Sequence, residues 1–353
     1  MTLYQNELYM DDVSYVAGLS LPWEKLQGKT LMLSGATGMI GSFLVDVIMQ
    51  KNAEGLNCTV YALGRSEERA RTRFQADFFE KGYLKFVKYD VREPLIFTFN
   101  GSVDYILHLA SNTHPVQYAT EPISTITTNI IGLMNLLDFA VEHKTSRFAF
   151  ASSNEIYGEN RGDVELFDES YMGYIDSNTL RAGYPESKRC GEALCQAYKA
   201  EKGLDVVIPR LTRTYGPTML MSDTKAISQF IKKSVAGEDI VLKSEGYQYY
   251  SYTYVADAVS GLLTVLLCGE NGEAYNIADI SSDITLRNLA RILARINGKE
   301  VVFELPDAVE SAGYSKATKA RLDGSKIRSL GWESQYEINK GLERTVEILK
   351  SLA

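Results

Sequence analysis

The feature that most constrains this chain is a glycine-rich turn between a predicted strand and a predicted helix. Residues 29–35 form a short apolar run, KTLMLSG, and the sequence GATGMIG runs on from its last residue. The segment that follows has apolar side chains at helical spacing, at Ile40, Phe43, Leu44, Val47 and Ile48. Gly35 permits a tight turn, Gly38 lets the backbone approach a pyrophosphate, and Gly41 lets helix and strand pack closely. The pattern favours a dinucleotide site over a turn with no ligand.

Strand and helix patterns alternate along the first half of the chain. Strands are predicted at 58–63, 84–89, 103–110 and 146–152, with helices at 66–81 and 123–143. Such alternation is typical of βαβ units on a parallel sheet, so we expect an α/β fold, a Rossmann-like doubly wound sheet.

The pattern changes after residue 210. Gly216-Pro217 interrupts the chain, and the predicted helices at 223–236 and 285–296 are separated by short strands. We therefore expect a dinucleotide-binding domain over 1–210, with an N-terminal extension at 1–28. Residues 211–353 are expected to form mainly a smaller mixed α/β substrate lobe, with some segments returning to the first domain.

Composition excludes several function classes. The 353 residues include 37 basic and 45 acidic ones, a net charge of −8, which does not favour nucleic acid as a partner. Four cysteines without a CxxC pair, and three histidines, give no metal-ligand spacing, so no metal is expected. The first twenty residues lack a basic signal-peptide region, and no uninterrupted apolar run reaches the length of a membrane span. We expect no membrane partner and a cytoplasmic location.

Two residues bear on the adenosine end of the cofactor. An NAD site usually has an acidic residue after the second strand, whereas this chain has Arg65 there. Arg65 pairing with a 2′-phosphate gives a slight preference for NADP over NAD, and a solvated arginine is the alternative. Asp90, after the third strand, is a candidate adenine contact or simply an acidic turn residue.

A second constellation is Tyr184-Pro-Glu-Ser-Lys188. On a helix, residues four apart share a face, and a cationic lysine beside a phenol lowers the pKa of that phenol. Tyr184 is thus a candidate general base on a sugar or alcohol hydroxyl. Ser152 and Ser153 follow a predicted strand and are placed to offer a hydroxyl to the same oxygen, or else form turn contacts. Taken alone, YxxxK is a common coincidence.

These motifs together resemble a known family. GATGMIG, HLAS (108–111), TTNIIG (127–132), FASSNEIYG (150–158) and YPESK (184–188) are similar to the extended short-chain dehydrogenase/reductases, specifically the nucleotide-sugar epimerases, dehydratases and decarboxylases. The resemblance runs from about Lys29 to Trp332. It is closest to UDP-glucuronate decarboxylases, through HLASNTHPVQY, SSNEIYG and RAGYPESKR.

The resemblance implies transient oxidation at sugar C4 by a bound NAD(P). Tyr184 would be the base, Lys188 would hold the phenolate and the nicotinamide ribose, and Ser153 would steady the C4 oxygen. Glu155 would act on the carbon next to the ketone, unless it is only a turn carboxylate. Implied cofactor contacts are Gly35, Thr37, Gly38, Met39, Ile40, Gly41, Arg65, Asp90, Val91, Ala110, Ser111, Asn129, Ser152, Tyr184 and Lys188. Implied substrate contacts are Tyr118, Ser153, Asn154, Arg213 and Tyr250.

The chain departs from the decarboxylase pattern at three positions. Tyr250 and Thr218 stand where arginines are expected, and Arg213 stands where an asparagine is expected. Asn154 also replaces the aspartate usual in dehydratases. We expect a UDP-glucuronate decarboxylase-like enzyme; the alternatives are a nucleotide-sugar 4-epimerase or 4,6-dehydratase, a net alcohol dehydrogenase or reductase, and a cofactor-binding regulator without turnover.

Two further expectations concern assembly and access. The resemblance implies a homodimer, formed through a two-helix face. The insertion between Glu159 and Gly183 is too long for a simple connection and is either a lid over the site or a surface excursion.

Overall fold

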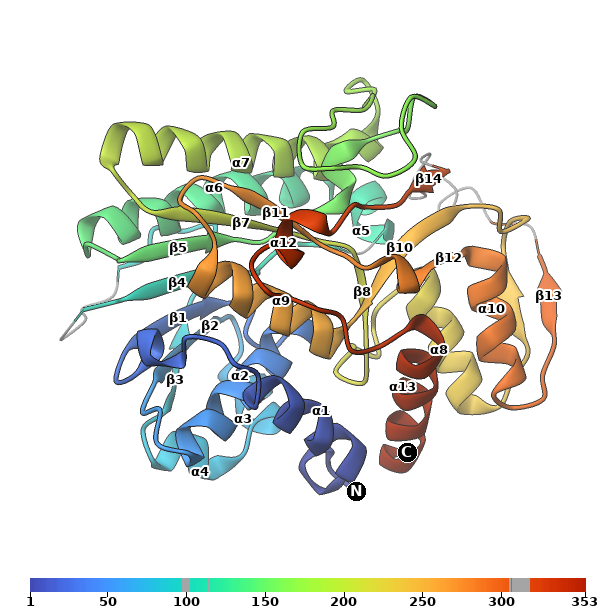
Figure 1. The fold of residues 1–353 in the computed structure, drawn as a ribbon, viewed down its shortest axis with the longest axis horizontal. Coiled ribbons are helices and arrows are strands. Elements are labelled where there is room, and N and C mark those ends of the chain that lie inside the picture. The colour runs from blue at the N-terminus through green and yellow to red at the C-terminus, as the bar shows by residue number, and fades with distance from the viewer. Residues whose placement is uncertain (97–101, 114, 305, 307–317) are drawn as a thin grey trace.

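The core of the protein is one large parallel sheet. The computed structural model describes residues 1–96, 102–113, 115–304, 306 and 318–353 (Figure 1). Across the sheet the strands are β3 (Leu84–Lys88), β2 (Thr59–Gly64), β1 (Thr30–Ser34), β4 (Tyr105–His108), β5 (Arg147–Phe150), β7 (Val206–Leu211) and β11 (Ala274–Ile277), and β6 (Ser152–Ser153) also pairs with β7. Every pairing is parallel. The order reverses between β1 and β4, which confirms the doubly wound Rossmann-like fold.

Helices cover both faces of this sheet. On one face lie α6 (Pro122–Glu142) and α7 (Gly183–Lys202), which pack against each other (Figure 1). On the other lie α2 (Met39–Ala53), α9 (Val255–Cys268) and α1 (Glu7–Ala17). Among the described residues, α6 alone is long and apolar enough to span a membrane by length and composition, and half of its apolar window is buried inside the protein.

A smaller mixed lobe is built around β10 (Tyr249–Tyr254). This strand pairs in parallel with β8 (Arg213–Tyr215) and β14 (Lys319–Ala320), and antiparallel with β12 (Asp283–Thr285). The lobe also contains α8 (Ala226–Ala236), α10 (Leu286–Arg295), α13 (Ile338–Leu352) and the parallel pair β9 (Ile240–Leu242) and β13 (Val301–Phe303). The chain beyond residue 211 also supplies α9 and β11 to the large sheet, so the two units interleave in space.

Short elements join these parts. They are η1 (Leu3–Gln5), η2 (Trp23–Leu26), α5 (Pro115–Thr120), η3 (Asn154–Tyr157), η4 (Leu180–Ala182), η5 (Ile280–Ser282) and α12 (Ser325–Arg328).

Two helices differ in extent from the sequence-based prediction. The predicted helix 66–81 is two helices, α3 (Glu67–Arg73) and α4 (Ala76–Glu80), because Phe74 adopts an extended backbone and is buried in the core. The helix predicted from Asp223 begins at Ala226, since the Asp223 carboxylate accepts the Lys225 N–H and holds a turn there.

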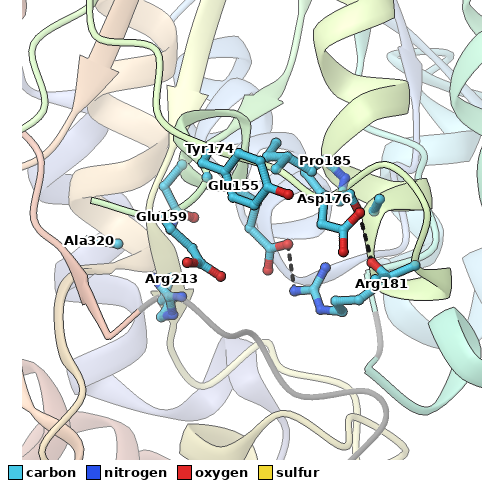
Figure 2. Close-up of a pocket in the computed structure, with 13 residues that line it drawn as sticks. Glu155, Glu159, Tyr174, Asp176, Arg181, Pro185, Arg213 and Ala320 are labelled. Carbon is cyan, nitrogen blue, oxygen red and sulfur yellow. Dashed lines mark hydrogen bonds and ion pairs between the residues drawn. The ribbon is translucent and has the colours of Figure 1, made fainter. Parts of the chain in front are cut away.

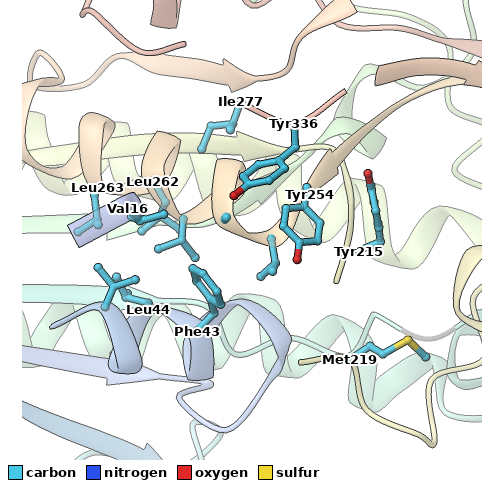
Figure 3. Close-up of a cluster of buried hydrophobic side chains, with 14 of the residues drawn as sticks. Val16, Phe43, Leu44, Tyr215, Met219, Tyr254, Leu262, Leu263, Ile277 and Tyr336 are labelled. Atoms are coloured by element: carbon cyan, nitrogen blue, oxygen red, sulfur yellow. The ribbon is translucent and has the colours of Figure 1, made fainter. Parts of the chain in front are cut away.

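The N-terminal extension joins the two units through a buried carboxylate. Asp12 of α1 is fully buried and accepts hydrogen bonds from Tyr254 Oη at 2.5 Å, Tyr336 Oη at 2.6 Å and Arg344 Nε at 2.9 Å. Around it, apolar side chains of α1, α2 and α9 meet the aromatic rings of the smaller lobe (Figure 3). The extension therefore forms part of the core that holds the lobes together.

Candidate active site

The glycine turn lies between β1 and α2, at the edge of the sheet where the strand order reverses. Gly35 has φ +75°, a conformation that favours glycine, and a Cβ added there would lie 2.9 Å from the Ala110 nitrogen. A Cβ at Gly41 would lie 2.3 Å from the Gly35 oxygen. Gly38 is the N-cap of the 15-residue helix α2, and Thr37, Met39 and Ile40 complete the turn. This narrow cradle at a helix N-terminus fits the pyrophosphate of a dinucleotide.

The residues proposed for the adenosine end lie after β2 and β3. Arg65 is exposed. Asp90 is held by Arg92, whose Nε and Nη2 donate to both carboxylate oxygens at 3.0 and 2.7 Å, and these bonds lower the pKa of Asp90 to about 2. The charge of Arg65 contributes to that lowering. Val91 packs against α6 at Gly132, where a Cβ would lie 2.9 Å from Val91 Cγ2.

A line of hydrogen bonds connects the end of β4 with α6 and α7. The Ala110 N–H donates to Ser34 Oγ at 3.1 Å, and Ser111 Oγ donates to Asn129 Oδ1 at 2.7 Å. Asn129 is fully buried and donates from Nδ2 to Ser187 Oγ at 2.9 Å. These bonds fix the carboxyl end of β4, where Ala110 and Ser111 line the expected nicotinamide side of the site.

Tyr184 and Lys188 lie on the first turns of α7, as the four-residue spacing predicts. Both are buried, and Lys188 Nζ donates to the Ala151 carbonyl at 2.8 Å. The ammonium is 4.7 Å from the Phe150 ring centroid and 6.0 Å from that of Tyr184. Burial lowers the pKa of Lys188 to about 7, and the charge of Glu192 partly offsets this effect.

The Tyr184 phenol differs from the sequence-based expectation of a lowered pKa. Its pKa is raised above the ordinary value, first by burial and then by the charge of Glu155. Hydrogen bonds from Ser153 and Ser111 act in the opposite direction. The Tyr118 ring stacks on it, with centroids 4.9 Å apart. Among the protein's own groups, burial and the charge of Glu155 outweigh those that lower the pKa of this phenol, so Tyr184 needs further positive charge nearby before it can act as a base.

The end of β6 brings three predicted residues to this point. Ser153 Oγ accepts the Glu155 N–H at 3.2 Å, which starts η3, and Asn154 is buried. The Ser152 hydroxyl is buried and has no hydrogen-bond partner among the residues that the structure describes. An orphaned buried hydroxyl beside the glycine-turn edge of the sheet is consistent with a polar ligand there.

A cavity opens beside Asn154 and Glu155. The insertion 159–183 forms one wall of it through Glu159, Tyr174, Ile175, Asp176 and Thr179. The insertion is held by an antiparallel bridge between Glu159 and Tyr174 and by the Phe167 N–H, which donates to the Arg321 carbonyl. It therefore lines the site instead of passing over an unrelated surface.

Glu155 forms an ion pair that the sequence reasoning did not foresee. Arg181 Nη2 donates to Glu155 Oε2 at 2.6 Å, and both side chains are largely buried (Figure 2). The Arg181 guanidinium also lies 4.8 Å from the Tyr118 ring centroid. Arg181 comes from η4, three residues before Tyr184 in RAGYPESKR. The motif therefore contained this arginine, but nothing in it indicated that Glu155 is its partner.

Arg213 and Tyr250 meet in the smaller lobe. The Arg213 guanidinium carbon lies 3.5 Å from the centroid of the Tyr250 ring, and Arg213 lines the same cavity as Glu155. Thr218 has a different role from an anion contact, because its hydroxyl donates to the Met39 carbonyl at 2.9 Å and fastens the smaller lobe to the glycine turn. Tyr252 and Tyr254 on the same strand are buried packing residues.

His108 is a buried structural residue. Its Nδ1 lies 2.6 Å from Ser34 Oγ, and burial together with the charge of Lys188 lowers its pKa to about 3, so the ring is neutral. His114 lies outside the described residues. Within the described part of the chain, no three His, Cys, Asp or Glu side chains gather as a metal site would require.

A family model agrees with this geometry. The model named "NAD dependent epimerase/dehydratase family" matches residues 31–278, which span β1 to β11. The chain belongs to this family. The predicted membership is thereby confirmed, as is the expectation of an enzyme that uses NAD(P).

Curated relatives and solved structures extend the comparison. UDP-glucuronic acid decarboxylase 1 of Xenopus tropicalis is 30% identical over 334 residues, which are 91% of this chain and 72% of the relative. UDP-glucuronic acid decarboxylase 6 of Arabidopsis thaliana is 31% identical over 313 residues, which are 88% of this chain and 86% of that protein. DesIV of Streptomyces venezuelae, a dTDP-glucose 4,6-dehydratase solved with NAD and TYD bound, is 27% identical with a TM-score of 0.77 and covers 91% of this chain and 97% of its own.

Proposed function

We propose that this protein decarboxylates a nucleotide-linked uronic acid of the UDP-glucuronate type, through transient oxidation at sugar C4. The observation that carries the proposal is the juxtaposition of the buried Tyr184, whose pKa is sensitive to both Ser153 and Glu155, with the carboxylate of Glu155 on the wall of the neighbouring cavity. Support also comes from the curated relatives, which are named UDP-glucuronic acid decarboxylases. The reaction is redox-neutral, because the hydride taken from C4 is returned.

Three residues of the chain have separate roles in the first step, the oxidation at C4. A nicotinamide cofactor, when bound, supplies a hydride acceptor and later a hydride donor. Tyr184 takes the proton of the C4 hydroxyl, and Ser153 holds the same oxygen by a hydrogen bond. Lys188 would add positive charge that favours the phenolate, and its hydrogen bond to the Ala151 carbonyl holds the ammonium 6.0 Å from the centroid of the Tyr184 ring.

The second step follows from the ketone. A carboxylate two carbons from a C4 carbonyl is a β-keto acid, so the bond between C5 and the carboxyl carbon breaks with its electrons passing into the enolate. Carbon dioxide leaves, and C5 then accepts a proton. We assign the Glu155 carboxyl group to proton transfer at C5, because Glu155 lines the cavity in which the sugar ring would lie.

The direct test is incubation of the purified protein with UDP-glucuronate and each cofactor, followed by mass spectrometry of the sugar nucleotide. Loss of carbon dioxide, without lasting accumulation of reduced cofactor, is the expected result. Clean inversion at C4 would identify an epimerase. Steady accumulation of reduced cofactor would identify a dehydrogenase, and a retained ligand without any product would point to a regulator.

A second candidate is dehydration of a nucleotide hexose, since DesIV shares 27% of its residues with this chain. Asn154 counts against this reaction, because it occupies the position where dehydratases usually have an aspartate. Loss of water from dTDP-glucose, with a 4-keto product, would favour this candidate over decarboxylation.

The cofactor preference that we infer is NADP over NAD. Arg65 is exposed after β2, and its charge reaches the Asp90 carboxylate at the end of the next strand. An arginine at this position pairs well with a 2′-phosphate. Arg65→Ala should weaken NADP binding more than NAD binding in calorimetry, and equal losses would refute the preference.

We also propose a homodimer formed through α6. This helix carries exposed apolar side chains at Ile123, Ile126, Ile131 and Met134, although its other face is buried against the sheet and α7. Light scattering coupled to size exclusion should give twice the monomer mass. Ile131→Glu should convert the dimer to a monomer, whereas a wild-type monomer would refute this interface.

A further inference from the structure

Two arginines that line the cavity beside Glu155 each have a buried guanidinium nitrogen without a hydrogen-bond partner among the described residues. The two nitrogens are Arg181 Nε and Arg213 Nη1. Both arginines line this cavity (Figure 2). A buried N–H without an acceptor is costly, so each of these donors favours a ligand that brings an oxygen.

The ion pair between Arg181 and Glu155 is only half made. Arg147 and Arg210 each use Nε and Nη2 together to hold both oxygens of one carboxylate, on Asp205 and Glu192. Arg181 uses Nη2 alone on Glu155, at 2.6 Å, and its Nε has no partner in the part of the chain that the structure describes. If Glu155 releases Nη2, then Nε and Nη2 of Arg181 together can donate to both oxygens of a second carboxylate.

Arg213 is less free to exchange partners. Its guanidinium lies flat on the Tyr250 ring, 3.5 Å from the centroid, and this stacking fixes its position. It offers one additional donor from the smaller lobe. The two arginines thus approach the cavity from opposite units of the fold, with Glu155 between them (Figure 2).

The remaining charges of the cavity are acidic. Glu159 and Asp176 line it along with Glu155, so three carboxylates face two guanidinium groups. An anionic ligand that enters while Glu155 stays paired with Arg181 would raise this excess of negative charge. A carboxylate that replaces Glu155 on Arg181 instead gains the two-point contact, and it leaves Glu155 unpaired beside the ligand.

We propose that Arg181 recognises the carboxylate of the sugar by ion-pair exchange, and that this exchange releases Glu155 for its step. The subsite takes a nucleotide sugar with a carboxylate on the ring, and a neutral hexose cannot make the exchange. The inference rests on the proposed function for the identity of the ligand. It supplies the anion contact that Tyr250 and Thr218 do not provide.

The test is calorimetric binding of UDP-glucuronate and UDP-glucose to cofactor-loaded protein, with every variant made in a Tyr184→Phe background so that no turnover occurs. Arg181→Gln should weaken UDP-glucuronate binding at least about tenfold and change UDP-glucose binding less than about threefold. Glu155→Gln should tighten UDP-glucuronate binding, because Arg181 no longer has to give up an ion pair. Arg161→Gln, which removes an exposed charge from the same insertion, is the matched control and should change neither affinity.

Arg181→Lys keeps the charge without the planar fork, and it should give an intermediate loss for UDP-glucuronate alone. It also keeps the test decisive if Arg181→Gln fails to fold. Equal losses for both ligands, no loss for the uronate, or weaker uronate binding by Glu155→Gln would each overturn the exchange. If the variants bind as expected but protein with Tyr184 intact releases no carbon dioxide from UDP-glucuronate, the proposed function is refuted and the exchange is not. Release of carbon dioxide with unchanged binding by Arg181→Gln would refute the exchange alone.

Discussion

Lys188→Met should make the cofactor-free protein more stable although it removes activity. Lys188 is 3% exposed, and burial lowers its pKa from 10.5 to about 7. Between those two values the unfolded chain binds more protons than the folded protein, so wild-type stability rises with pH in that window. Methionine has a similar length and carries no charge, so the stability of the variant lacks this dependence.

The magnitude follows from the two pKa values. The fall in the pKa corresponds to a loss of unfolding free energy of about 5 kcal/mol well below pH 7, at about 1.4 kcal/mol for each pKa unit, and of about 4 kcal/mol at pH 7, where Lys188 is half deprotonated. Losing the hydrogen bond to the Ala151 carbonyl costs about 1 kcal/mol in return. Lys188→Met is therefore expected to gain about 3 kcal/mol at pH 7, and this advantage should shrink by about 2 kcal/mol by pH 9.

The assay is urea unfolding of the cofactor-free protein, followed by circular dichroism at pH 7 and pH 9. Lys202→Met is the control, because Lys202 is an exposed lysine in the last turn of the same helix. A gap between Lys188→Met and wild type that is the same at both pH values would refute the argument from burial. So would a variant that is less stable than wild type at pH 7.

Three further outcomes are expected. Tyr184→Phe should lose at least about a hundredfold in turnover while it keeps the fold and cofactor binding, and near-normal turnover would require another base. Gly41→Ala should weaken cofactor binding at least about tenfold in calorimetry, because a Cβ there lies 2.3 Å from the Gly35 oxygen and the turn must open; unchanged affinity would count against the cradle. Asp12→Ala should lower stability by about 3–5 kcal/mol in urea unfolding, since Arg344 then loses a buried partner, whereas the exposed neighbour Asp11→Ala should be almost silent.

The fold and the centre of the site could be predicted from local sequence patterns. The apolar run before Gly35 and the helical spacing after it depend on neighbours within one strand and one helix, so the β1–α2 unit could be predicted from the sequence. The same holds for Tyr184 and Lys188, because residues four apart on a helix share a face wherever that helix lies. The resemblance then added Glu155, which the structure places on the cavity and close enough to Tyr184 to raise its pKa.

Contacts between distant segments could not be predicted in this way. Arg181 pairs with Glu155 across 26 residues, and Thr218 bonds to the Met39 carbonyl across 179. Asp12 meets Arg344 across 332 residues. No periodicity specifies such partners, because they depend on how complete elements pack.

The sequence by itself determined a doubly wound sheet with a glycine cradle and a tyrosine–lysine pair, since each is set by spacing along the chain. Only the tertiary structure decided which charges surround the reacting groups. It fastened Thr218 to the glycine turn, stacked Arg213 on Tyr250, and put Arg181 against Glu155. Charge interactions depend on distance in space and on burial, and packing of the two units fixes both.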